Sequence, residues 1–216
     1  LVGSEMCIRD RTVIDLSTET TAVPVEGKSY ELGMKSSWLD GRLTGNLAIF
    51  RTDEDNFALN PLYNTSFNQY ASEIGTIRSQ GIEMGLSGNV TENFNLVFGF
   101  ASFSLKNMKS GARIRSNIPT QTINLLGTYT IPQIPKLKIG AGIKWQDDIH
   151  DTSYSSVRQD AYTLLSAMAS YQVNKNVLLQ INGNNLTNEK YLTGLSGGQG
   201  YYSAPANYTV SVKFKY

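Results

Sequence analysis

Residues 207–216, which read NYTVSVKFKY, decide the fold class of this chain. Large apolar side chains stand at every second position from Tyr208 to Tyr216, and polar or charged side chains stand between them. A period of two places alternate side chains on opposite faces of a β-strand. One face of this strand is therefore apolar and the other is polar, and the alternation continues to the aromatic residue that ends the sequence.

Similar alternation recurs upstream and predicts eight further strands. In 137–145, for example, large apolar side chains alternate with lysines and glycines. Small and charged residues on the second face favour contact with water over contact with another sheet. The nine predicted strands are 28–38, 42–57, 76–88, 94–106, 117–131, 136–147, 160–171, 177–186 and 206–216. Because no segment has a helical period, the chain is predicted to be an all-β antiparallel meander.

The connections between the predicted strands alternate in length. The short ones are 39–41, 91–93, 132–135 and 173–176, and the long ones are 58–75, 107–116, 148–159 and 187–205. Outer-membrane β-barrels have short periplasmic turns and longer extracellular loops, whereas soluble sandwiches have no reason to sort loop lengths by side. The pattern predicts a transmembrane barrel in the cell outer membrane of a Gram-negative bacterium, with the C-terminus in the periplasm.

Composition limits the classes of protein to which the chain can belong. Charged residues form 17% of the sequence, against roughly 25% in an average soluble protein, and the formal net charge is +1. This charge provides no basic surface, so we expect no nucleic-acid partner. The sequence contains no run of 18 apolar residues and therefore predicts no membrane helix. A membrane strand is compatible with this composition, because its lumen side is polar.

Five stretches of the sequence resemble motifs of one protein family. They are GKSYELGMKSSWLDGRLTGNLAIF at 27–50, RSQGIEMGLSG at 78–88, IPTQTINLLGTY at 118–129, NGNNLTNEKY at 182–191 and APANYTVSVKFKY at 204–216. In composition and order these stretches are similar to the barrel of TonB-dependent outer-membrane receptors, in particular the siderophore-receptor subgroup. Together they cover most of the chain from about Gly27 to Tyr216.

The resemblance implies that the chain supplies nine C-terminal strands of a 22-stranded transmembrane β-barrel and forms an open curved sheet in isolation. Residues 28–216 are assigned to the barrel, and 12–27 to the remnant of an extracellular loop. Residues 1–11, LVGSEMCIRDR, are unlike the remainder. They are interpreted as a non-native leader similar to sequencing-adapter read-through, with a native N-terminal segment as the alternative. The plug domain of the family is absent from the sequence.

The resemblance also implies TonB-dependent active transport of a ferric siderophore. The expected partners are the siderophore, outer-membrane lipid, the barrel assembly machinery, and TonB with its inner-membrane motor through the missing N-terminal region. Uptake of haem or cobalamin and a passive porin are the alternatives, and a soluble all-β binding module or an outer-membrane enzyme would belong to other classes. We expect no enzyme activity and no cofactor, because the sequence lacks a nucleophile elbow, a phosphate loop and paired metal ligands.

Four tyrosines in the two longest connections are the predicted ligand-binding residues: Tyr63, Tyr70, Tyr201 and Tyr202. Aromatic faces and phenol hydroxyls suit a bulky, partly apolar ferric chelate. The stretch GLSGGQGYYSAP at 194–205 places the second pair after a glycine-rich run that we expect to be mobile. The alternative is that Tyr201 and Tyr202 extend an aromatic girdle or pack loop on loop.

The stretch DDIHD at 147–151 contains the only histidine of the chain, His150, beside three carboxylates. Oxygen and imidazole ligands of this kind bind calcium or chelated iron in other proteins. A charged tip of a solvated loop has the same composition, and this is the interpretation that we favour. The sequence therefore predicts no metal site and no catalytic residue.

Overall fold

The computed structural model describes residues 13–59, 61–151 and 157–215. The proposed leader at 1–11 and the terminal Tyr216 lie outside these residues. Within the described ranges the chain contains strands and turns, and no helix of a length and apolarity that would cross a membrane. The chain divides into two compact units, one formed by residues up to 33, 48–82 and 103–115, and the other by 34–47, 83–102 and 116–216.

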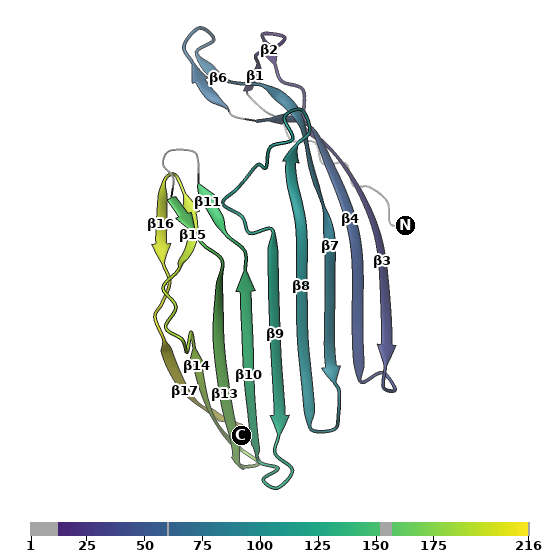
Figure 1. The fold of residues 1–216 in the computed structure, drawn as a ribbon, viewed down its shortest axis with the longest axis vertical. Coiled ribbons are helices and arrows are strands. Elements are labelled where there is room, and N and C mark those ends of the chain that lie inside the picture. Colours follow the sequence, from purple (N-terminus) through teal and green to yellow (C-terminus); the bar gives the residue numbers. More distant parts are fainter. Residues whose placement is uncertain (1–12, 60, 152–156, 216) are drawn as a thin grey trace. The chain divides into compact units, whose positions relative to one another are not determined.

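Nine strands form the main sheet in the order β17-β14-β13-β10-β9-β8-β7-β4-β3 (Figure 1). Their bounds are β3 Glu26–Trp38, β4 Leu43–Ala58, β7 Ile74–Asn89, β8 Phe94–Asn107, β9 Gln121–Thr130, β10 Leu137–Gln146, β13 Tyr162–Asn174, β14 Val177–Asn184 and β17 Asn207–Phe214. The prediction of nine strands in sequence order is confirmed. Among the described strands the sheet does not close, since β3 and β17 stand at the two ends of the order.

The strand boundaries differ from the prediction at a few positions. β9 begins at Gln121 instead of 117, because the preceding residues form turns and the amide and hydroxyl of Thr120 hydrogen-bond to Asp147. β13 continues to Asn174, with an irregularity in its pairing to β14 between Gln172 and Asn174. The short turn predicted at 173–176 is therefore only two residues long.

The register of the sheet separates apolar from polar side chains. Phe98 pairs with Leu125, Leu125 with Ile143, and Ile143 with Leu165, so these side chains share one face across β8, β9, β10 and β13. The neighbouring positions on the opposite face are Gly99, Asn124, Lys144 and Leu164, which are small or polar except for Leu164. The predicted assignment of an apolar and a polar face is confirmed for these strands.

Among the described residues, the apolar face of the main sheet carries largely exposed side chains and no buried core. Ile139, Ile143, Ile181 and Val210 each have about two fifths or more of their side-chain surface exposed. Buried apolar side chains occur instead in or near the long connections: Ile14, Ala22, Ala58, Ala71 and Ile77 in one unit, and Ile149, Tyr162 and Leu195 in the other. Exposed apolar area of this extent is unfavourable in water and indicates an apolar surrounding.

The long connections contain strands that the sequence did not predict. β1 Val13–Asp15, β2 Thr20–Thr21, β5 Leu62–Asn64 and β6 Gln69–Ser72 form one small sheet in the order β2-β1-β6-β5. β11 Ile149–Asp151 pairs with β12 Val157–Gln159, and β15 Leu192–Ser196 pairs with β16 Gln199–Tyr202. Segment 12–27 was predicted to be a loop remnant, and its described part contains β1 and β2. Its extracellular position stays a prediction.

Candidate functional site

Tyr63 and Tyr70 form one aromatic pair. They face each other in the register of the β5–β6 hairpin, with ring centroids 5.8 Å apart and an interplanar angle of 82°. The Tyr63 hydroxyl donates a hydrogen bond to Asn68 Oδ1 at 2.5 Å, and Asn68 has a φ of 49° in the hairpin turn. Edge-to-face packing and this hydrogen bond hold both rings in one orientation. Each side chain is more than half exposed and available to a ligand.

The β5–β6 hairpin is anchored by strand β1. β6 pairs in parallel with β1, so Ile14 lies beside Ala71, and Asp15 beside Ser72. Ile14, Ala71 and Ser72 are buried. Beside the first tyrosine is an open hollow of about 400 Å³, lined by Leu16, Leu62, Tyr63, Asn64, Thr65 and Ala71. The arrangement is a fixed aromatic edge next to a small concave surface, which is suited to contact a planar or partly apolar group.

Tyr201 and Tyr202 lie on β16, in the second hairpin. Its turn consists of Gly197 and Gly198, whose φ angles of 59° and 76° are left-handed and permit a two-residue connection between paired strands. The glycine-rich run forms this tight turn, and its mobility stays a prediction. Adjacent residues of a strand point to opposite faces, so the two tyrosines offer aromatic surface on both sides of the hairpin. Both are highly exposed.

Three hydrogen bonds fasten this hairpin to neighbouring connections. Gly198 N–H donates to Asp151 Oδ2 at 2.9 Å, Asn117 Nδ2 donates to the Leu195 carbonyl at 3.1 Å, and Leu192 N–H donates to Gln159 Oε1 at 2.7 Å. Asp151 and Leu195 are buried. A charged acceptor strengthens a backbone hydrogen bond, and burial protects it from competing water. The second tyrosine pair therefore stands on a rigid support.

Replacing Asp151 by alanine is expected to loosen the β15–β16 hairpin without unfolding the sheet. The change removes the charged acceptor of Gly198 N–H, a loss of about 1–3 kcal/mol in local stability. Amide hydrogen exchange in Leu192–Tyr202 should become roughly 5- to 150-fold faster when followed by mass spectrometry. Asp148→Ala is the control, because Asp148 forms only a partly exposed ion pair with Arg158 at 3.7 Å. Equal acceleration in the two variants would contradict the anchoring role.

The DDIHD stretch is part of this support. Asp147 accepts hydrogen bonds from the amide and the hydroxyl of Thr120, Asp148 pairs with Arg158, and Asp151 holds the hairpin turn. Within the described ranges, no group of three or more His, Cys, Asp and Glu residues is arranged to hold a metal ion. The interpretation as a solvated loop tip is wrong for Ile149 and Asp151, which are buried in β11.

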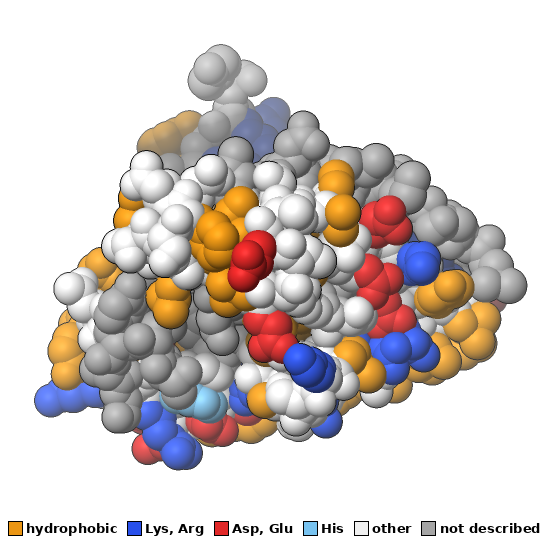
Figure 2. All heavy atoms as spheres, turned by 90° about the horizontal axis from the view of Figure 1, so that it is seen from above, with side chains coloured by type: hydrophobic (Ala, Val, Ile, Leu, Met, Phe, Trp, Pro, Cys, Tyr) orange, Lys and Arg blue, Asp and Glu red, His pale blue; other side chains and the backbone are white. Residues whose placement is uncertain are grey.

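A further charged pair lies in the long connections. Lys109 and Glu73 form an ion pair between two connections, and the carboxylate raises the pKa of Lys109. Figure 2 shows acidic and basic side chains beside exposed apolar ones in the view from above. The two residues are far apart in the sequence, so no local pattern points to the pair.

The structure brings the rings of Tyr63 and Tyr70 together, whereas the adjacent Tyr201 and Tyr202 point to opposite sides of β16. Tyr63 and Tyr70 belong to one compact unit, and Tyr201 and Tyr202 to the other. A sheet that has one apolar and one polar face, short turns at one end and anchored hairpins at the other defines a wall segment of a membrane β-barrel. The hairpins present exposed tyrosine side chains, whereas the strands present repeating apolar and polar rows.

The family model described as "TonB dependent receptor-like, beta-barrel" matches residues 18–186. The chain belongs to this family of outer-membrane receptors, so the apolar face of its sheet is the lipid-facing one.

Similar proteins are siderophore receptors. The chain is 32% identical to a ferric-pyoverdine receptor of Pseudomonas putida over 200 residues, which are 89% of this chain and 24% of that protein. It is 31% identical to a probable TonB-dependent siderophore receptor of Acinetobacter baumannii over 211 residues, with 89% and 27% covered. It superposes on the crystal structure of the outer-membrane ferripyoverdine receptor of Pseudomonas aeruginosa with a TM-score of 0.85 and 26% identity, over 97% of this chain and 29% of that one.

Proposed function

We propose that this chain is part of a TonB-dependent receptor that imports a ferric siderophore across the outer membrane. The observation that carries the proposal is the similarity of nearly the whole chain to a receptor whose crystal structure holds ferripyoverdine. The chain spans about a quarter of the length of the curated relatives that it matches. Its contribution to the receptor is therefore barrel wall together with the two tyrosine-bearing hairpins.

In this proposal the long connections are extracellular and the C-terminus is periplasmic. Short turns at one rim and longer, structured connections at the other support the orientation. TonB and its inner-membrane motor act through a part of the receptor that the sequence does not contain, and the barrel assembly machinery inserts the wall. The chain supplies positioning and contact surface, and we propose no catalytic step.

The tyrosines are proposed to contact the siderophore. Tyr63 and Tyr70 offer a ring edge and a ring face beside the hollow, and Tyr201 and Tyr202 offer exposed rings on a pinned hairpin. Rigid aromatic side chains lose little conformational entropy when they bind, so they contribute affinity at low cost. Because the support beneath each hairpin is buried, a ligand would meet surfaces that are already ordered.

Changing each tyrosine to alanine is expected to weaken ligand binding by roughly 2- to 10-fold, since an aromatic contact contributes about 0.5–1.5 kcal/mol. The receptor that contains this chain would be expressed in iron-limited cells, with uptake of radioactive iron measured from ferric pyoverdine and, separately, from haem. Tyr30→Ala is the matched control, because Tyr30 is as exposed as Tyr70 but lies on the lipid-facing side of the sheet. Surface amounts of receptor are equalised.

Each result has a separate meaning. Normal uptake in all four variants would remove the hairpins from the binding site and leave the transport proposal standing. Uptake of iron from haem but not from ferric pyoverdine would overturn the choice of substrate. Uptake that persists in cells without TonB would overturn active transport and favour passive diffusion.

A further inference from the structure

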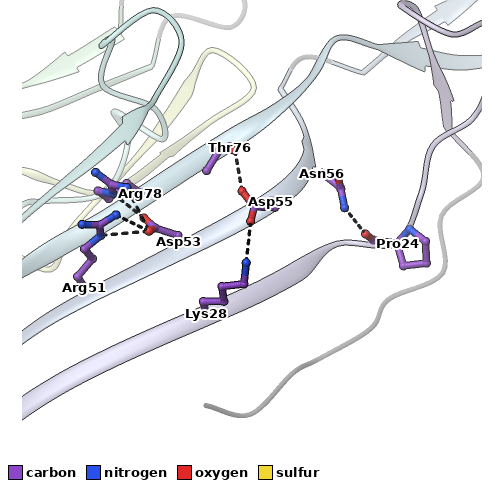
Figure 3. Close-up of polar contacts among 8 residues, drawn as sticks. All are labelled: Pro24, Lys28, Arg51, Asp53, Asp55, Asn56, Thr76 and Arg78. Atoms are coloured by element: carbon purple, nitrogen blue, oxygen red, sulfur yellow. Dashed lines mark hydrogen bonds and ion pairs between the residues drawn. The ribbon is translucent and has the colours of Figure 1, made fainter. Parts of the chain in front are cut away.

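Five charged side chains form a row on one face of β3, β4 and β7: Lys28, Arg51, Asp53, Asp55 and Arg78 (Figure 3). Three cations against two carboxylates leave one net positive charge. All five belong to the same compact unit. The proposal of siderophore transport does not use them, and they lie outside both tyrosine hairpins.

Alternation along the strands identifies the face of this row. Ser29 Oγ and Thr52 Oγ1 lie 2.9 Å apart on one face, so Lys28 and Arg51, their sequence neighbours, project from the other. Tyr30 shares the face of Lys28, and Ile49 shares that of Arg51. Both apolar side chains are at least half exposed. The charged row therefore lies on the lipid-facing side of the sheet, next to exposed apolar side chains, and does not face the lumen.

The contacts in the row differ in strength. Arg78 binds Asp53 with two parallel hydrogen bonds, Nε to Oδ1 at 2.5 Å and Nη2 to Oδ2 at 3.1 Å. Arg51 directs Nε and Nη2 to the single oxygen Oδ2 at 3.0 and 2.8 Å. A guanidinium group has five N–H donors, so Arg51 retains donors for a further acceptor. Asp53 thus holds two guanidinium groups in fixed positions.

Lys28 is held more loosely. Its ammonium group lies 3.8 Å from Asp55 Oδ2, while Oδ1 of the same carboxylate accepts a hydrogen bond from Thr76 at 2.7 Å. The exposed side-chain fractions are 59% for Lys28 and 47% for Arg51, against 25% for Arg78 and 15% for Asp53. Lys28 and Arg51, which lie nearest the apolar residues, are therefore also the most accessible of the three cations. The Asp53 carboxylate is less exposed than either of them.

We propose that Lys28 and Arg51 bind phosphate groups of an anionic lipid headgroup in the outer leaflet of the membrane. This inference rests on the orientation proposed above, in which the strand ends beside the long connections are extracellular. An arginine presents parallel donors that match phosphate oxygens, and a cation at the membrane surface attracts anionic lipid. The adjoining Tyr30 and Ile49 place acyl chains immediately beside the headgroup site.

The test uses the whole receptor in two kinds of phosphatidylcholine vesicle. One contains roughly 5–10% lipid A, which is a phosphorylated glycolipid, and the other contains no lipid A. Binding is measured as the amount of lipid A retained per receptor on extraction and by native mass spectrometry. The double variant Lys28→Gln with Arg51→Gln is expected to bind lipid A about 25-fold more weakly, since each cation at a membrane surface changes affinity about fivefold.

Two controls keep the proposal falsifiable. Lys35→Gln with Lys144→Gln removes the same charge from the lumen face and should change binding by less than about twofold. Lys28→Arg with Arg51→Lys preserves both charges and should bind within about threefold of the natural receptor. Equal losses in the two glutamine variants would overturn the proposal, as would full displacement of lipid A by inorganic phosphate, which would identify a site for the free anion.

Discussion

Replacing Ile143 by arginine is expected to lower the free energy of unfolding of the receptor barrel by about 2–4 kcal/mol. Ile143 pairs with Leu125 and Leu165 on the lipid-facing side of the sheet, toward the middle of β10. A guanidinium group at that depth would enter hydrocarbon, where it has no water and no counter-charge. Urea unfolding of the receptor in vesicles, followed by the mobility shift of folded barrels on gels, would measure the change.

Leu126→Arg is the matched control for this experiment. Leu126 has the same 42% exposure as Ile143, but it pairs with Gly142 on the opposite face. The same substitution there meets water, so we expect a loss below about 1 kcal/mol. If the two variants lost equal stability, the assignment of the lipid-facing side would be wrong.

Replacing Gly88 by alanine is expected to cost at least about 1–3 kcal/mol, the strain of a non-glycine residue in this backbone conformation. Gly88 has a φ of 141° at the end of β7, and a Cβ built there would lie 2.0 Å from the carbonyl oxygen of Arg42 and 2.8 Å from Leu43 Cα. The start of β4 would have to move. The Asn89 N–H bond to the Arg42 carbonyl, 2.8 Å long, would be displaced with it.

Gly99→Ala provides the comparison for Gly88. Gly99 lies in β8, where a Cβ would meet no atom within 4 Å and the backbone is not left-handed. We expect a change within about 0.5 kcal/mol in the same unfolding measurement, as for other unstrained surface sites. A comparable loss at Gly99 would indicate that any side chain in these strands is harmful, and would remove the special role of the Gly88 backbone.

The nine long strands and their two faces were predictable because one physical signal determines both. An apolar residue at every second position, as in β10 and β17, encodes strand and orientation together. Short turns such as that between β3 and β4 contain residues that adopt left-handed backbone: Leu39, Asp40 and Gly41 all have positive φ. Asp40 and Gly41 are residue types typical of turns and indicate the turn in the sequence, whereas Leu39 does not.

The strands within the long connections were not predictable in the same way. β5 and β11 have three residues each, too few to establish a period. Their pairing depends on partners brought close by the main sheet, as when Gly198 reaches Asp151. The aromatic character of the candidate site was predictable from composition, whereas the rigidity of its second hairpin depends on this buried carboxylate.

The charged row shows a limit of the period-two pattern. Ionisable side chains in barrel strands are expected to face the lumen. Glu31 and Lys35 fit this expectation, because alternation along β3 places them on the face of Ser29. Lys28 and Arg51 lie on the other face, where β3 and β4 carry both charged and apolar side chains. The expectation fails where a strand leaves the hydrocarbon layer, because its lipid side then meets polar headgroups.

The parallel pairing of β1 with β6 has a consequence for the order in which these strands form during assembly. Residue 13 lies beside residue 70, and the strands β3 and β4 intervene between these segments. Closing such a long loop is entropically costly until the intervening antiparallel strands have formed. The β1–β6 pairing that supports Tyr63 and Tyr70 is therefore expected to form after strands β3 and β4 have paired. If Tyr63 and Tyr70 contact the siderophore as proposed, a receptor stalled early in assembly would not yet present this aromatic pair to the ligand.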